Sequence, residues 1–153
     1  MSNSIAKLFA TFFGMGYSPF ASGTTASIAG MLIYFVFCYN ITIYLLIFVV
    51  ITFLGFLTSG KVERLSNKKD PSCVVIDEVS GAMITFFMLP QIPSVLITAF
   101  FLFRAFDMFK VYPADKFEVF PGSMGIMLDD IVAGLYTNLV MHIVLSIKTG
   151  TLL

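Results

Sequence analysis

The sequence predicts an all-α membrane protein, a polytopic bundle of about five spanning helices preceded by a short N-terminal interfacial helix. Of its 153 residues, 58% are hydrophobic and 12% are charged, whereas soluble domains average about 45–50% apolar and about 25% charged residues. The mean hydropathy is +0.95. The apolar residues also form runs that approach the roughly 20 residues with which a helix crosses a bilayer. The length fits one membrane-embedded domain over residues 1–153.

The chain begins with a short apolar segment and a polar loop. Residues 5–13 are too few to cross a bilayer, so we expect a helix that lies at the membrane interface. Residues 14–27 mix glycine, proline and hydroxyl side chains, which is typical of a loop. Two apolar runs follow with only Asn40 between them, and this predicts a helical hairpin over residues 28–39 and 41–57.

Three further spans complete the predicted bundle. Residues 58–72 are rich in charged side chains and contain an Asp-Pro pair, so we expect a solvent-exposed loop there. The third span is predicted over residues 74–89, the fourth over residues 94–109 and the fifth over residues 126–147.

Five crossings would separate the charged residues sharply. All nine acidic residues, and every basic residue except Lys148, would lie on the same side of the membrane as the N-terminus. Basic loops stay in the cytoplasm. We therefore expect this charged face to be the cytoplasmic side of a bacterial inner (plasma) membrane, and the C-terminus to lie outside.

The charged side chains gather at three helix ends that this topology brings to one membrane depth. Two simpler explanations exist for these charges. Acids at helix N-termini gain about 0.3–1 kcal/mol from the helix dipole, and the Arg, Asp and Lys side chains along one helix could form ion pairs with one another. Neither explanation accounts for several carboxylates at one depth, where an ionised group is costly unless it is paired or bound to a cation. The residues concerned are Asp77, Glu78, Arg104, Asp107, Lys110, Asp129 and Asp130.

A hard divalent cation would relieve this repulsion. Carboxylate oxygens without a cluster of Cys or His favour Mg²⁺ over zinc, since Mg²⁺ takes carboxylates, waters and phosphate oxygens as ligands. We therefore expect Mg²⁺ near the two acid pairs. His142, deep in the fifth span, is interpreted as a hydrogen-bonded core residue rather than a catalyst.

The segment before the fifth span suggests a phosphate site. Residues 122–125 read Gly-Ser-Met-Gly, and glycines at a helix N-terminus let backbone N–H groups approach an anion. Arg104 and Lys110 could hold the remaining phosphate oxygens. A cation beside a phosphate makes phosphoryl transfer or hydrolysis the natural chemistry.

These residues resemble the phosphatidylglycerophosphatase A family. The similarity runs in family order over about residues 14–134, and its most specific block surrounds Asp129 and Asp130. The matching residues are Ser18, Pro19, Gly23, Thr24, Ser27, Ile76, Asp77, Glu78, Gly81, Arg104, Asp107, Lys110, Pro113, Gly122, Gly125, Ile126, Met127, Asp129, Asp130, Ala133 and Gly134. The sequence departs from the family pattern at Ser22, Ala26, Val111 and Ser123, and none of these departures removes a charged group.

The resemblance implies a phosphatidylglycerophosphatase-like domain that uses Mg²⁺ to convert the phospholipid phosphatidylglycerophosphate into phosphatidylglycerol, the precursor of cardiolipin. The partner expected from this resemblance is therefore a phospholipid in a membrane. Nucleic acid is not expected as a partner, because the net charge of the chain is zero. The resemblance implies that Asp77, Glu78, Asp107, Asp129 and Asp130 are metal-binding or catalytic acids, without deciding which acid has which role. We assign Asp77, Glu78, Asp129 and Asp130 as metal ligands, and Asp107, as attacking group or base, with Arg104 and Lys110 as catalytic residues. The implied substrate-binding residues are Ser18, Gly23, Thr24, Gly122 and Ser123.

Two other classes of protein would also carry charges in a membrane. A phospholipid head-group transferase of the CDP-alcohol type would place acids at a membrane rim, but its D-G-x-x-A-R run with two later aspartates is missing here. A small ion-coupled carrier is the non-enzyme alternative. It predicts acids spread towards the middle of the membrane, whereas these acids gather at one edge.

Overall fold

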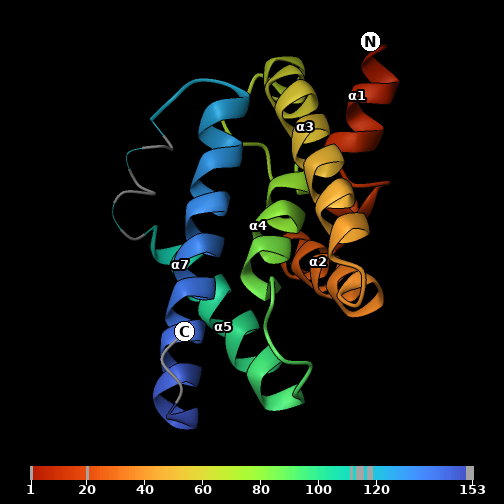
Figure 1. Cartoon of the computed structure of the whole chain (residues 1–153). Helices are drawn as coiled ribbons and strands as arrows, with labels where there is room; N and C mark the ends of the chain where they lie inside the picture. The colour runs from red at the N-terminus through yellow and green to blue at the C-terminus, as the bar shows by residue number, and fades with distance from the viewer. Residues whose placement is uncertain (1, 20, 111, 113–115, 117–118, 151–153) are drawn as a thin grey trace.

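A computed structural model of the protein describes residues 2–19, 21–110, 112, 116 and 119–150. Within these ranges the chain forms six α-helices, one 3-10 turn and no strand, so the predicted all-α class is confirmed (Figure 1). Pro113, one of the residues that resemble the family, lies outside the described residues, as does Val111. The elements are α1 (Asn3–Ala10), η1 (Met15–Tyr17), α2 (Ser22–Phe37), α3 (Ile41–Ser66), α4 (Ile76–Phe86), α5 (Pro93–Phe109) and α7 (Ser123–Thr149).

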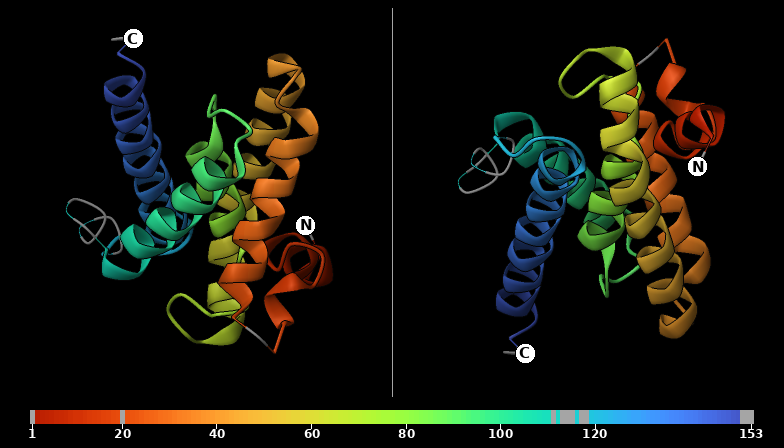
Figure 2. Two further views of the ribbon diagram at one scale, coloured as in Figure 1. Left: turned by 90° about the horizontal axis from the view of Figure 1, so that it is seen from below. Right: turned by 90° about the horizontal axis from the view of Figure 1, so that it is seen from above.

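Helix α4 lies at the centre of the bundle. It packs against α2 and α3 on one side and against α5 and α7 on the other (Figure 2). Val79, Ala82, Met83 and Phe86 are completely buried. Ser80 and Thr85 are buried as well, and each donates a hydrogen bond of 3.0 Å to the backbone carbonyl four residues earlier.

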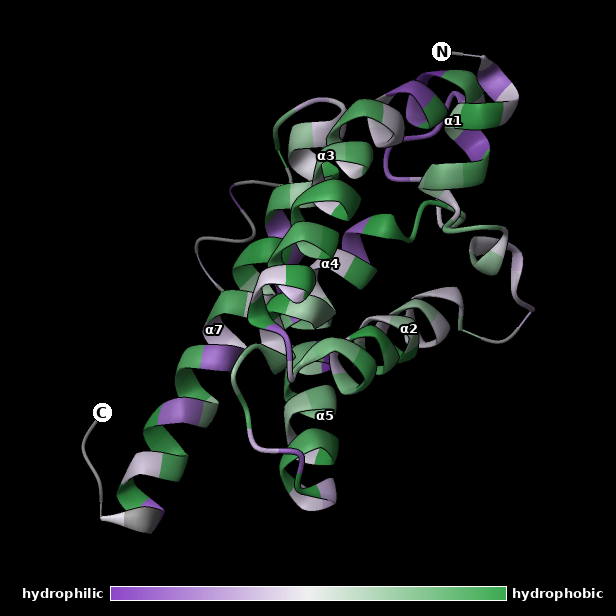
Figure 3. Ribbon diagram, turned by 45° about the vertical axis from the view of Figure 1, so that its right-hand side comes forward, coloured by the Kyte–Doolittle hydropathy of each residue, from purple (hydrophilic) through white to green (hydrophobic). Residues whose placement is uncertain are grey.

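Two helices, α3 and α7, are long and apolar enough to cross a membrane. Their outward faces carry large exposed hydrophobic side chains, and the ribbon of α3 is coloured mainly as hydrophobic in Figure 3. Exposed apolar surface of this extent is typical of contact with a membrane or a partner. Examples on α3 are Leu46, Val49 and Phe53, and examples on α7 are Leu139 and Ile147.

The predicted span over residues 74–89 is only partly helical. Helix α4 has 11 residues, which at 1.5 Å per residue is about 16 Å and too short to cross about 30 Å of hydrocarbon. Among the described residues, α3 and α7 are the helices long and apolar enough to cross a membrane. The structure therefore supports a helical bundle with two membrane-length helices, and the five crossings stay a prediction.

Two loops predicted from polar composition are wrong in part, because the helices extend into them. Residues 22–27 belong to α2 and residues 58–66 belong to α3. Hydroxyl side chains fit inside these helices by donating to the backbone of the preceding turn. Ser27 donates to the carbonyl of Gly23 at 2.8 Å, and Thr58 donates to the carbonyl of Leu54 at 2.7 Å.

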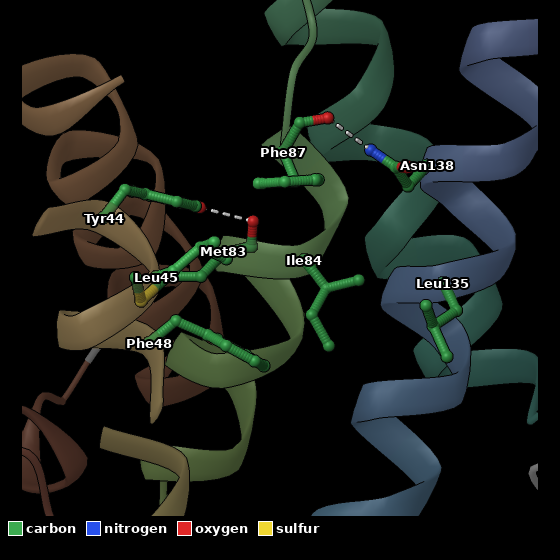
Figure 4. Close-up of a pocket in the computed structure, with 8 residues that line it drawn as sticks. All are labelled: Tyr44, Leu45, Phe48, Met83, Ile84, Phe87, Leu135 and Asn138. Carbon is green, nitrogen blue, oxygen red and sulfur yellow. Dashed lines mark hydrogen bonds between the residues drawn. The ribbon is translucent and has the colours of Figure 1, made fainter. Parts of the chain in front are cut away.

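The C-terminal end of α4 is buried, and its carbonyl groups need partners because the last four have none within the helix. The N–H groups of Phe87 and Leu89 donate to the carbonyls of Ile84 and Phe86. Side chains from α2, α3 and α7 donate to the other two carbonyls and to two in the turn that follows the helix. Tyr44 donates to Met83, Asn138 to Thr85 and Phe87, and Tyr34 to Leu89, while His142 lies 3.3 Å from the carbonyl of Phe87. The predicted hydrogen bond of His142 is therefore present, but the side chain is half-buried and does not belong to the buried core. Figure 4 shows two of these bonds beside an apolar pocket of about 260 Å³ between α3, α4 and α7.

Candidate active site

The crossing of α4 and α7 places two acid pairs next to each other. A Cβ atom on Gly134 would overlap the carbonyl group of Gly81, and a Cβ on Gly81 would lie 2.6 Å from the carbonyl oxygen of Asp130. The two backbones therefore touch at this point. Asp77 precedes Gly81 by one helical turn, and Asp130 precedes Gly134 by the same distance. Both acids consequently lie on the same side of the crossing.

A single cavity of about 390 Å³ opens beside these acids. It is lined by the first residues of α2, the loop before α4, the first turn of α4, the end of α5 and the second turn of α7. The structure thus brings together all seven charged residues that the sequence placed at one membrane depth. The lining residues are Ala21, Ser22, Gly23, Asp70, Ser72, Val74, Asp77, Glu78, Arg104, Asp107, Met108, Lys110, Asp129 and Asp130.

Ion pairs connect the helices across this cavity. Arg104 Nη1 lies 2.7 Å from Asp107 Oδ2 on the same helix and 3.6 Å from Glu78 Oε1 on α4. Lys110 Nζ lies 3.0 Å from Asp129 Oδ2 on α7. Of the expected ladder along α5, the pair of Arg104 and Asp107 is present, and both cations reach acids on other helices.

The acids outnumber the cations, and some carboxylate oxygens have no partner. Asp77, Asp129 and Asp130 are 6%, 7% and 3% exposed. Among the described residues, Asp77 Oδ1 and Glu78 Oε2 are buried without a hydrogen-bond partner. A buried acceptor of this kind is costly unless a donor or a cation meets it.

Burial changes the pKa values of the two acids on α4, which is too short to cross a membrane. Burial raises the pKa of Glu78 to about 8, although Arg104 favours its charged form. Burial and the negative charge of Glu78 together raise the pKa of Asp77 well above its usual range. Both acids consequently hold a proton more readily in the folded protein than in water.

The donor set of this cavity fits Mg²⁺. Among the described residues, no three Asp, Glu, His or Cys side chains lie close enough to hold one ion together as they stand. Mg²⁺ is commonly bound through one or two carboxylates, with waters and phosphate oxygens as its other ligands. The partnerless oxygens of Asp77 and Glu78 are suitable donors for such an ion.

Several residues expected to bind substrate lie away from the cavity. Ser18 follows the 3-10 turn, and Thr24 lies on α2 beside Gly23, which does line the cavity. Gly122 and Ser123 begin α7, where the hydroxyl group of Ser123 accepts a hydrogen bond of 2.8 Å from the N–H of Gly60 on α3. In this arrangement the Gly-Ser-Met-Gly segment packs α7 against α3, and a phosphate-binding role for it stays a prediction.

Asp70 is a cavity residue that the sequence analysis missed. Residues 58–72 were predicted to be a solvent-exposed loop, yet Asp70 and Ser72 line the cavity beside the buried acids. The Asp-Pro pair indicates only a chain break. No local signal relates this loop to α4 and α7, so only the tertiary structure could reveal the proximity.

The family model for phosphatidylglycerophosphatase A matches residues 8–145 of the chain. The chain belongs to the phosphatidylglycerophosphatase A family. As a member of this family, the protein is a phosphatase. The matched range includes every residue that lines the cavity.

Individual relatives agree with the family match. The chain is 31% identical over 140 residues to phosphatidylglycerophosphatase A of Escherichia coli, covering 90% of this chain and 81% of the relative. It is 32% identical over 140 residues to phosphatidylglycerophosphatase A of Haemophilus influenzae, covering 87% and 84%. It is 37% identical over 139 residues to a Bacteroides thetaiotaomicron protein named putative phosphatidylinositol-3-phosphatase, covering 85% and 87%. No solved structure matches the chain.

Two departures from the family pattern have structural roles in this phosphatase. Ser22 donates a hydrogen bond of 3.0 Å to the carbonyl of Ser72, which ties the start of α2 to the loop that carries Asp70. Ser123 joins α7 to α3 through Gly60, as described above. Both substitutions thus affect how segments around the cavity are held, and neither removes a charged group from it.

Proposed function

We propose that the protein hydrolyses phosphatidylglycerophosphate to phosphatidylglycerol and phosphate, in a Mg²⁺-dependent reaction at the cytoplasmic face of a bacterial inner membrane. The observation that carries the proposal is the cavity itself. Acids from α4, α5 and α7 meet Arg104 and Lys110 there, in a chain of this family. Groups that bind a phosphate and groups that can bind a cation are therefore adjacent.

The cavity residues divide into those that hold phosphate and those that hold the cation. Arg104 and Lys110 would exchange their present carboxylate partners for phosphate oxygens and offset the charge that develops in the transition state. Mg²⁺ would be held through one or two carboxylates from among the four acids of α4 and α7 and, when bound, neutralises phosphate oxygens and lowers the pKa of a bound water. These four acids are Asp77, Glu78, Asp129 and Asp130.

Asp107 is our candidate for the group that starts the reaction. It is half-buried at the cavity and oriented by Arg104 at 2.7 Å. It would either remove a proton from the attacking water or attack phosphorus itself. In both cases the bond between phosphorus and the glycerol oxygen breaks, and the departing oxygen takes up a proton. If Asp107 attacks, an aspartyl phosphate would form, and a water molecule would then hydrolyse it to release phosphate and restore the carboxylate.

The membrane placement follows from the apolar surface and from the distribution of charge. Helices α3 and α7 would cross the bilayer, and the charged cavity would lie at the side that carries the basic loops. The acids gather at this one end of the bundle. This favours a head-group enzyme over an ion-coupled carrier, whose sites lie near the middle of the membrane.

The test is phosphate release by the purified protein in detergent, with Mg²⁺ or with a chelator. The substrates are phosphatidylglycerophosphate and, because one relative carries that name, phosphatidylinositol 3-phosphate. We expect release from phosphatidylglycerophosphate with Mg²⁺ only. Asp129→Asn and Asp130→Asn should each lower the rate by about 10²-fold or more while the protein still inserts into membranes. Full activity in both variants would refute the assignment of the site, and preference for the inositol lipid would refute the substrate.

A further inference from the structure

Asp70 lies at the mouth of the acid cavity. It is exposed, in the loop between α3 and α4, and it lines the same cavity as Asp77 and Asp129. It also borders a smaller pocket that contains Lys69 and Asp129.

The backbone on both sides of Asp70 is held in place. Its φ of 45° lies in the left-handed region, which Asp tolerates better than most residues. Its N–H donates to Glu63 Oε1 at 3.4 Å, and Pro71, which follows it, is buried. The next residue, Ser72, accepts a hydrogen bond of 3.0 Å from Ser22. The end of α3 and the start of α2 together fix where this acid stands.

A second observation in the cavity points to a cation. Asp77 is 6% exposed, and its Oδ1 atom is buried with no hydrogen-bond partner. A carboxylate oxygen in this position is satisfied by a donor or by a positive ion. The side chain of Asp77 lines the same cavity as that of Asp70, so one ion could be approached from the buried side and from the mouth.

We propose that Asp70 is a ligand of the divalent cation, supplied from the mouth of the cavity to complement the buried acids of α4 and α7. The inference rests on the proposed Mg²⁺-dependent function. Mg²⁺ loses its waters reluctantly, and an exposed carboxylate at the mouth can bind it before it is fully dehydrated. Asp70 then raises the affinity for the ion and provides the way into the site.

The test measures cation binding without substrate, on the full chain purified in detergent. Mn²⁺ is the probe, because it shares the preference of Mg²⁺ for oxygen ligands, and free Mn²⁺ is counted by electron paramagnetic resonance. Asp70→Asn keeps the size of the side chain and tolerates the left-handed backbone, and Asp70→Gly relaxes that backbone. The control is Asn3→Lys, which makes the same change in net charge at an exposed position of α1 outside the cavity.

We expect Asp70→Asn and Asp70→Gly to bind Mn²⁺ about 10-fold or more weakly than the wild type, while Asn3→Lys binds it normally. Wild-type affinity in either Asp70 variant overturns the inference, because the carboxylate would then not be needed for binding. If Asp70→Gly alone kept wild-type affinity, the geometry of the turn and not the carboxylate would be what matters. A wild-type protein that binds no Mn²⁺ also overturns it. The proposed function fails separately, if the wild type does not release phosphate or does so equally well in a chelator.

Discussion

The carboxylate of Glu78 lies directly against the backbone of Gly23, at the point where the start of α2 meets the start of α4. A Cβ atom on Gly23 would overlap Glu78 Oε1 and lie 3.0 Å from Arg104 Nη2. Only a hydrogen at this position leaves room for the ion pair between these two side chains. Gly23 therefore acts on the cavity through the two groups that it allows to approach.

Replacement of Gly23 by alanine should lower activity more than stability. The new methyl group would displace the flexible ends of Glu78 and Arg104, and misplaced catalytic groups can cost about 10²-fold in rate. We expect kcat for phosphate release to fall, with little change in the thermal midpoint in detergent. Gly30→Ala is the matched control on the same helix. There the methyl group would meet the Val79 carbonyl oxygen at 2.8 Å, so that variant should mainly lose stability. Equal losses in both variants would contradict the explanation for Gly23.

Replacement of Gly134 by alanine should separate α4 from α7. The added methyl group would collide with the carbonyl of Gly81, and neither backbone can move without shifting an acid pair. We expect a loss of about 1–3 kcal/mol in the free energy of unfolding, together with reduced phosphate release. Gly55→Ala is the control, because its methyl group would meet the flexible end of Met127 at 2.5 Å. A Gly134→Ala protein as stable and active as the wild type would show that the crossing tolerates a wider spacing.

Replacement of Asn138 by leucine should destabilise the protein without changing the chemistry. Asn138 donates to the carbonyls of Thr85 and Phe87 at 3.1 and 2.8 Å, and leucine has a similar shape but no donor. An unsatisfied buried carbonyl costs about 1–3 kcal/mol, so the thermal midpoint should fall. The activity of the folded fraction should stay the same, because Asn138 does not line the acid cavity. Leu139→Ala, at an exposed neighbouring position, provides the comparison.

The stability of the metal-free protein should fall as the pH rises. Burial raises the pKa of Glu78 from 4.5 to about 8, so the folded protein binds a proton that the unfolded chain has released. This stabilising contribution is complete below 4.5 and is lost as the pH rises towards 8. Mg²⁺ binds ionised carboxylates, so its stabilising effect should grow over the same range.

The corresponding measurement is the thermal midpoint from pH 5 to about pH 9, with a chelator or with Mg²⁺. Glu78→Gln should make the metal-free profile flatter, because the glutamine does not titrate. A wild-type midpoint that rises with pH in the chelator would contradict the raised pKa. The same slope in Glu78→Gln as in the wild type would mean that another group is responsible.

Helix class and charge clustering were both predictable from local sequence. Apolar runs identified α3 and α7, because a membrane-length hydrophobic helix needs no information beyond its own residues. The acid pair of Asp77 and Glu78 indicated a cation site, since adjacent buried carboxylates repel one another wherever they lie. Helix ends were less predictable. The hydroxyl groups of Ser27 and Thr58 suggested loops, yet both side chains bond to the preceding turn inside a helix.

The sequence by itself determined that this protein is helical, that two of its helices are long and apolar enough to cross a membrane, and which segments carry the charged residues. Those properties depend on the composition of each segment taken alone. Only the tertiary structure decided that Asp70 stands beside the buried acids and that Ser123 packs against Gly60 instead of lining the cavity. These contacts depend on where separate helices cross, and the crossings are set by close backbone approach at glycines such as Gly81 and Gly134, which no single segment specifies.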